Sequence, residues 1–203
     1  MAGVRMELVK QLRAMSGAGM MDCKNALEEA EGDLQKAFTI LREKGIAKAG
    51  QRAGRTTGQG VVESYLHNTG DGYPPQVGVL IEVNCETDFV ARNERFKELV
   101  RDVAMHVAAM SPQFLDRESV PSDVLDGVKA ELEKTVPSGK PPDVVEKILS
   151  GKLNKWYEEH ALLEQPFVKD DAQSVGELVN AVSGVLGEKI RVRRYMKYAL
   201  GEE

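Results

Sequence analysis

The chain has few of the residues that form covalent or metal-held frameworks. Its 203 residues include two cysteines and three histidines. Cys23 and Cys85 do not belong to a Cys-x-x-Cys pair, and no histidine stands at ligand spacing from either of them. Neither a disulfide framework nor a zinc site is therefore expected. We interpret both cysteines as reduced, partly buried thiols and expect no metal or other cofactor.

Long apolar runs are also missing. No segment approaches the roughly 20 apolar residues that a membrane-spanning helix needs, and the first residues lack the apolar core of a signal peptide. Hydrophobic residues make up 42% of the chain and charged residues 29%, which is typical of a soluble globular protein. The sequence thus predicts a cytoplasmic protein without a membrane partner.

The chain carries no strong positive charge. Its net charge is −5 and is unevenly distributed. Residues 1–59 contain ten Lys or Arg against seven Asp or Glu, whereas the remainder contains seventeen against twenty-five. Phosphate binding needs a basic surface. An acidic main body therefore argues against stable nucleic-acid binding.

Helical periodicity predicts three short helices in residues 1–50. The first ends where residues 16–19, Ser-Gly-Ala-Gly, interrupt the apolar pattern. The second begins near Asp22, a good N-cap residue, and ends at Gly32. Asp33 caps the third helix, and Gly45 is expected to end it. Three helices in this length predict a small domain with little core of its own.

Residues 51–59 are predicted to be a basic, glycine-rich linker, because the composition changes between about residues 44 and 60 to mainly Gly, Arg, Lys, Thr and Gln, which bury little apolar area. We interpret the segment as a mobile, solvated tether. The cations between about residues 44 and 60 could alternatively contact RNA or an acidic protein surface. They are Lys44, Lys48, Arg52 and Arg55.

Residues 60–203 are predicted to form an α+β core domain. Alternating apolar residues indicate strands at residues 61–67 and 77–83, and the turn residues between them predict an antiparallel hairpin. Residues 190–200 alternate well enough to form a last strand of the same sheet. Because strands and helices are segregated along the chain, a parallel doubly wound sheet is not expected.

Four helices accompany this sheet in the prediction. Apolar residues at helical spacing mark one helix from about residue 96 to 110, and others are expected at residues 122–135 and 143–159. Ser174 and Glu177 form a capping-box pattern, which predicts the start of a helix that runs to about Leu186.

Two segments contain residues that a purely structural role does not explain. In the first, Met20 and Met21 follow a glycine-rich turn, where a three-helix domain has little core to receive both. Methionine is flexible and polarizable and suits contact surfaces. The alternative is that one methionine closes the small core and the other is simply exposed.

The second segment is Thr87-Asp88-Phe89-Val90, at the junction between a strand and a helix. As an enzyme site it would use Glu86 and Asp88 as an acid/base pair or Cys85 as a nucleophile. No histidine lies nearby in sequence to activate the thiol, and carboxylates at such junctions are common helix caps. Capping does not explain why an aromatic residue follows Asp88, so a contact role is favoured.

Four motifs together resemble the elongation factor Ts family, whose members recharge elongation factor Tu with nucleotide. The motifs are LRxxSGAGMMDCKxAL (residues 12–27), LRxKG (41–45), EVNCETDFVA (82–91) and LxQPF (163–167). The resemblance implies a guanine-nucleotide exchange factor without bond chemistry. It also implies a ubiquitin-associated-like domain at residues 1–50 that docks on the GTPase domain of elongation factor Tu.

The resemblance assigns roles to seven residues. Leu12, Met20 and Met21 match the apolar contacts of the docking domain. Thr87, Asp88, Phe89 and Val90 match the segment that the family inserts near the partner's Mg²⁺ and nucleotide. The chain has room for one core subdomain, like the short family form in which two chains associate. A homodimer is therefore implied, through either the C-terminal strand or the region between Pro112 and Pro142.

Two alternatives from other classes remain open. An RNA-binding module would use the basic linker and the arginines near residue 193, and its association with RNA would depend steeply on salt. A thiol enzyme would use Cys85 as its nucleophile.

Overall fold

The computed structural model describes residues 6–68, 70, 72–137 and 141–202. The chain divides into two compact units. The first contains the chain as far as Val61 together with Val83–Leu99 and Val179–Arg193, and the second contains Val62–Glu82, Val100–Leu178 and the segment from Arg194 onward. The predicted boundaries at residues 50 and 60 remain a prediction.

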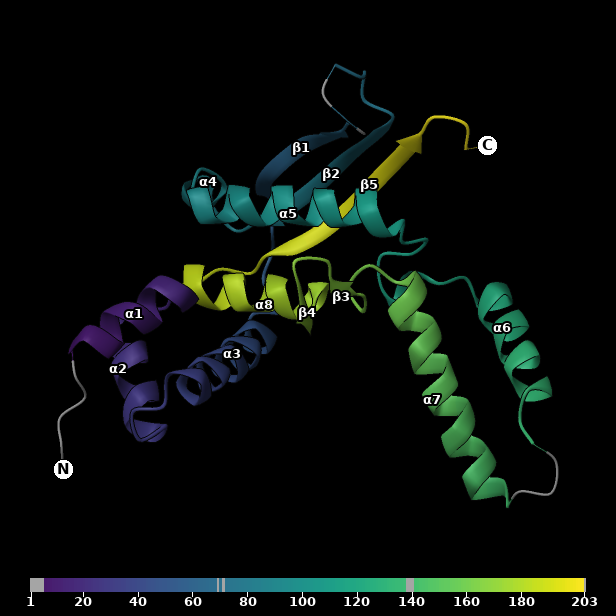
Figure 1. The fold of residues 1–203 in the computed structure, drawn as a ribbon, viewed down its shortest axis with the longest axis horizontal. Coiled ribbons are helices and arrows are strands. Elements are labelled where there is room, and N and C mark those ends of the chain that lie inside the picture. The colour runs from purple at the N-terminus through teal and green to yellow at the C-terminus, as the bar shows by residue number, and fades with distance from the viewer. Residues whose placement is uncertain (1–5, 69, 71, 138–140, 203) are drawn as a thin grey trace. The chain divides into compact units, whose positions relative to one another are not determined.

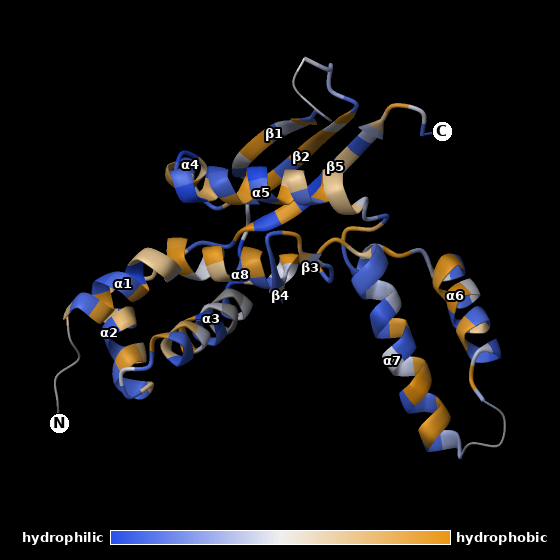
Figure 2. Cartoon of the chain, in the orientation of Figure 1, coloured by the Kyte–Doolittle hydropathy of each residue, from blue (hydrophilic) through white to orange (hydrophobic). Residues whose placement is uncertain are grey.

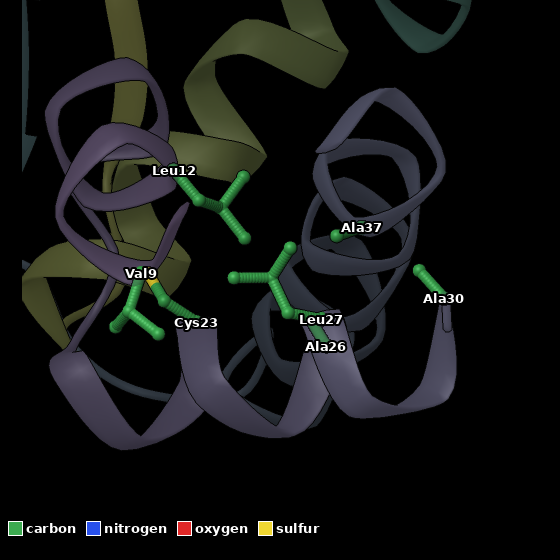
Figure 3. Close-up of a cluster of buried hydrophobic side chains, with 7 residues drawn as sticks. All are labelled: Val9, Leu12, Cys23, Ala26, Leu27, Ala30 and Ala37. Atoms are coloured by element: carbon green, nitrogen blue, oxygen red, sulfur yellow. The ribbon is translucent and has the colours of Figure 1, made fainter. Parts of the chain in front are cut away.

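The three predicted N-terminal helices are present as α1 (Met6–Ser16), α2 (Met20–Glu29) and α3 (Leu34–Gln51). Their apolar faces meet in one small core (Figure 3). Asp33 caps α3, because its Oδ1 accepts a hydrogen bond of 2.9 Å from the Lys36 backbone N–H. The buried members of this core are Val9, Leu12, Cys23, Ala26, Leu27, Ala30 and Ala37.

Two predicted helix boundaries are wrong. Gly19 rather than Asp22 is the N-cap of α2. More importantly, α3 continues through Gly45 to Gln51. A Cβ placed on Gly184 of α8 would lie 2.8 Å from the Cα of Gly45, so the two helix backbones touch there. This packing offsets the cost of about 1 kcal/mol that glycine carries in a helix interior.

The segment after α3 makes ionic and carbonyl contacts that the prediction of a mobile linker did not include. Arg52 Nη1 donates to the Ser183 carbonyl at 3.3 Å, and Arg55 Nη1 lies 3.3 Å from a Glu86 carboxylate oxygen. Lys189 Nζ donates to the carbonyls of Ala53 and Arg55. Composition reveals missing apolar contacts but not these ionic and carbonyl contacts. Lys44 Nζ pairs with Glu29, so the RNA-binding alternative loses three of its four linker cations to internal bonds. The side chain of the fourth, Lys48, lies outside the described part of the structure.

Three antiparallel strands form one small sheet, as predicted, which confirms the α+β fold class. They are β1 (Gln59–His67), β2 (Val77–Cys85) and β5 (Arg191–Ala199), in the order β1-β2-β5 (Figure 1). Alternate residues of β2 are buried, namely Val79, Ile81, Val83 and Cys85. Positions 69 and 71 of the predicted turn lie outside the described residues.

The predicted core helices are confirmed as α5 (Glu94–Met110), α6 (Ser122–Lys134), α7 (Pro142–His160) and α8 (Val175–Leu186). Polar and apolar residues alternate along α5, whereas apolar residues predominate in α8 (Figure 2). The capping box is formed: Glu177 N–H donates to Ser174 Oγ at 3.1 Å, and Ser174 N–H donates to Glu177 Oε2 at 3.0 Å.

One hairpin was not predicted from the sequence. Strands β3 (Pro166–Phe167) and β4 (Asp170–Ser174) pair antiparallel. They are too short and too polar to show an alternating pattern. Across the described residues, no helix combines the length and the apolar character needed to cross a membrane.

Candidate functional site

The Thr87–Val90 segment begins a one-turn helix directly after β2. Helix α4 (Asp88–Ala91) has Thr87 as its N-cap, with extended backbone angles of φ −125° and ψ 159°. The Thr87 hydroxyl oxygen accepts a hydrogen bond from the Val90 N–H at 3.5 Å. α5 starts three residues later, at Glu94, so α4 lies at the beginning of the longer helix (Figure 1). The expectation of a helix cap at this junction is confirmed.

The four residues of this segment differ in exposure. Phe89 is 82% exposed and Val90 is 9% exposed. Thr87 is exposed and Asp88 is half-buried. Asp88 Oδ2 lies 2.8 Å from Arg92 Nη2, and this ion pair joins residues that are about one helical turn apart. The segment therefore presents Phe89 to solvent, whereas Val90 attaches it to the protein.

Two glutamates 102 positions apart hold the base of the segment. Glu188 Oε2 accepts hydrogen bonds of 3.0 Å from the backbone N–H groups of both Glu86 and Thr87. In return, Glu86 Oε1 accepts a hydrogen bond of 2.6 Å from the Lys189 N–H. That bond, followed by the bond from Arg55, lowers the pKa of the Glu86 carboxyl. Sequence reasoning missed Glu188, because nothing in one sequence relates positions so far apart.

The structure argues against Cys85 as a nucleophile. The side chain is buried, and its Sγ donates to the Thr87 carbonyl at 3.1 Å. Burial, and then the charge of Glu188, raises the pKa of the Cys85 thiol to about 11. The reactive thiolate is therefore scarce near neutral pH. Cys23 is also buried and unbridged, and no metal-binding group of His, Cys, Asp or Glu occurs in the described part of the chain.

The predicted docking residues fall into two classes. Met20 and Met21 stand in the first turn of α2 and are 38% and 65% exposed. Leu12, in contrast, has no exposed surface and belongs to the core of the three helices (Figure 3). Leu12 lies in this core rather than on the surface, because its position on α1 faces α2 and α3. It can support the surface but cannot present one.

Arg95, at the start of α5, is bonded to the turn that precedes Met20. Its Nη2 donates to the backbone carbonyl of Ser16 at 2.6 Å. The next residue, Gly17, has a φ of +66°, and a Cβ there would lie 1.6 Å from Arg95 Nη1. A side chain at position 17 would strain the backbone and would displace the Arg95 guanidinium from its place. The turn before Met20 is consequently fixed to the start of α5, close in sequence to Phe89.

Comparisons with known proteins agree on one family. The family model described as "Elongation factor TS" matches residues 8–202. Elongation factor Ts of Desulforamulus reducens is 48% identical over 203 residues, which cover 100% of this chain and 91% of the relative. The Thermosipho melanesiensis factor is 50% identical over 97% of this chain and 98% of its own length. The Moorella thermoacetica factor is 52% identical over 96% of this chain and 94% of its own length.

Proposed function

Because the chain belongs to the elongation factor Ts family, we propose that it is a guanine-nucleotide exchange factor for elongation factor Tu. It binds the GDP complex during translation elongation in the cytoplasm and promotes GDP release until GTP binds. No bond is made or broken, so it needs no catalytic residue or cofactor. The observation that carries this proposal is Phe89, 82% exposed on a short helix whose base is held by hydrogen bonds.

The exchange step is an insertion of Asp88 and Phe89 beside the partner's Mg²⁺ site. A GTPase holds its nucleotide through Mg²⁺, which bridges the phosphates, and through backbone amides. A carboxylate and an aromatic ring placed next to that ion displace its ligands and weaken the strongest local charge partner of the nucleotide. Thr87 and Val90 set the position of the inserted pair, since one caps α4 and the other is buried.

Binding linkage accounts for turnover. If the factor lowers the partner's affinity for nucleotide, the nucleotide lowers the partner's affinity for the factor by the same ratio. Incoming GTP therefore displaces the factor. The factor increases the rate of exchange while the overall GDP/GTP equilibrium stays unchanged.

Docking on the GTPase domain is assigned to the N-terminal helices. Met20 and Met21 provide flexible apolar contacts, and their exposure on α2 supports this role. Leu12 supports the surface from the core below it. The proposal also retains the ubiquitin-associated-like description of this three-helix domain.

A homodimer also forms part of the proposal. It uses the face of the sheet opposite the buried side chains of β2, which we call the outer face. Alternate residues on the three strands place five large apolar side chains on that face, each between 54% and 72% exposed. A face of this kind can pair with its own copy about a twofold axis. The residues are Val62, Leu66, Leu80, Met196 and Tyr198.

A single mixing experiment tests the exchange function. Elongation factor Tu loaded with a fluorescent GDP analogue is mixed with excess unlabelled GDP, with and without this protein. We expect release to accelerate with factor concentration and to saturate. An unchanged release rate at every concentration would reject the proposal, and salt-dependent RNA binding without exchange would favour the RNA-binding alternative.

A further inference from the structure

We propose that Glu188 is a positioning residue for nucleotide exchange: its carboxylate fixes the direction in which Phe89 projects. This inference rests on the proposed function. Glu188 does not need to touch the partner, and it follows α8 rather than adjoining the inserted segment in sequence.

Glu188 receives three hydrogen bonds from the residues that precede Phe89. Its Oε2 accepts from the backbone N–H of Glu86 and of Thr87, both at 3.0 Å, and its Oε1 accepts from the Thr87 hydroxyl at 2.5 Å. Hydrogen bonds to a charged acceptor are stronger than neutral ones. The carboxylate thus satisfies two backbone donors that the sheet and α4 leave unpaired at this junction.

The bond to the Thr87 hydroxyl also determines how α4 is capped. A hydroxyl group has one hydrogen to donate, and its remaining lone pairs accept. Because the Thr87 hydrogen points to Glu188, an oxygen lone pair stays available for the Val90 N–H, 3.5 Å away. The orientation of α4, and with it the direction of Phe89, therefore depends on Glu188.

The backbone on either side of Glu188 is itself fixed. Gly187 has a φ of +77° and turns the chain after α8. The carbonyl of Glu188 accepts a hydrogen bond of 2.5 Å from the Ser183 hydroxyl, and the Lys189 N–H donates to Glu86. The acceptor is thus in place before any partner binds, as a group that positions a functional side chain must be.

Removing the carboxylate should change exchange more than docking. Met20 and Met21 lie on a different helix, and Val90 still attaches the segment, so binding to the partner persists. Phe89 then samples several directions, and only some of them reach the Mg²⁺ site. Misplacement of a functional group by about 1 Å can lower a rate about 100-fold.

The test compares Glu188→Ala and Glu188→Gln with wild type and with Glu146→Gln, at an exposed position of α7. Two quantities are measured: the maximal rate of GDP release at saturating factor, and the factor concentration that gives half of that rate. For Glu188→Ala we expect the maximal rate to fall about 10- to 100-fold, with a change of less than about threefold in the half-saturating concentration. Glu188→Gln keeps one acceptor oxygen, so its maximal rate should fall less. The maximal rate of Glu146→Gln should match that of wild type.

A double variant separates positioning from a general loss of structure. If Glu188 acts through Phe89, adding Glu188→Ala to Phe89→Ala lowers the rate no further. A further drop, or a half-saturating concentration that rises in proportion to the lost rate, overturns the inference. If Glu188→Ala keeps the wild-type rate while Phe89→Ala is inactive, the inference about Glu188 fails and the insertion model stands. If Phe89→Ala is itself fully active, the insertion model fails, and the inference fails with it.

Discussion

Phe89 and Val90 are adjacent in α4 and lie in opposite environments. Phe89 is 82% exposed, and Val90 is 9% exposed. Successive side chains on an α-helix differ in direction by about 100°, so a single turn can bury one residue while it presents its neighbour. Exposure of an aromatic ring this large is unfavourable for an isolated protein. The pair therefore gives matched variants that separate contact with the partner from stability.

Phe89→Ala should lose most of the exchange acceleration while the protein stays folded. An exposed side chain contributes little to the folded state, so the free energy of unfolding should change by no more than about 0.5 kcal/mol. GDP release from elongation factor Tu and urea unfolding measure the two effects. Wild-type exchange by Phe89→Ala would show that the ring is not the inserted group.

Val90→Ala is the matched control for this prediction. It removes two buried methyl groups and should lower the free energy of unfolding by roughly 1–3 kcal/mol. At temperatures where Val90→Ala remains folded, its exchange rate should exceed that of Phe89→Ala. The reverse order of exchange rates would assign the functional contact to Val90.

Met21→Glu should weaken association with nucleotide-free elongation factor Tu by on the order of 1–3 kcal/mol, if the side chain is a buried anchor of the complex. Met20→Glu should act in the same direction but less strongly, because Met20 is 38% exposed and Met21 is 65% exposed. Titration calorimetry measures both affinities. Met110→Glu, at a 45% exposed position of α5 in the second unit, is the control. Affinities equal to that of the control would mean that the two methionines are exposed without function.

The sequence predicted elements wherever one local pattern dominates. Alternation located β1, β2 and β5, and the spacing of Ser174 and Glu177 located the start of α8. Prediction from the sequence failed where contacts between distant residues override a local signal. Gly45 is a helix-ending residue by propensity, yet α3 continues because Gly184 packs against it. Tertiary contacts of this kind are invisible to periodicity.

The candidate site divides in the same way. Thr87 and Phe89 stand out in the sequence as a cap residue followed by an unexplained aromatic. Leu12 is matched to a partner contact by the resemblance, yet it lies in the core. A motif shared by a family contains core residues as well as contact residues. Glu188 and Arg95 could not have been found, since each acts through a backbone group far away in sequence.

Gly184→Ala should destabilise the protein, whereas Gly127→Ala should stabilise it, although both glycines are inside helices. A Cβ at position 184 would lie 2.8 Å from the Cα of Gly45, so the two helices must separate, at a typical cost of about 1–3 kcal/mol. A Cβ at position 127 meets no atom within 4 Å, and alanine gains up to about 1 kcal/mol in helix propensity.

Urea unfolding of the two glycine variants beside wild type gives both signs in one experiment. If Gly184→Ala were as stable as Gly127→Ala, the close approach of α3 and α8 would be wrong. The continuation of α3 past Gly45 would then have no packing contact to explain it.

Acidification should destabilise the protein through His106. The side chain is fully buried, and its Nδ1 accepts a hydrogen bond of 3.2 Å from the Val168 N–H. The proton of the neutral ring is therefore on Nε2, which lies 2.9 Å from Gln165 Oε1. Burial lowers the pKa of His106 below its ordinary value. Protonation would put a second hydrogen on Nδ1, directly facing the Val168 N–H.

The sign of the effect follows from proton binding. In the unfolded chain the histidine pKa is about 6.5, and in the folded protein it is lower. The unfolded state consequently binds more protons as the pH falls below about 6.5, so the free energy of unfolding decreases from pH 7 to pH 5. Urea unfolding across this range should show a shallower slope for His106→Gln than for wild type, even if the variant is less stable at every pH. Equal slopes in wild type and His106→Gln would mean that His106 does not couple folding to pH.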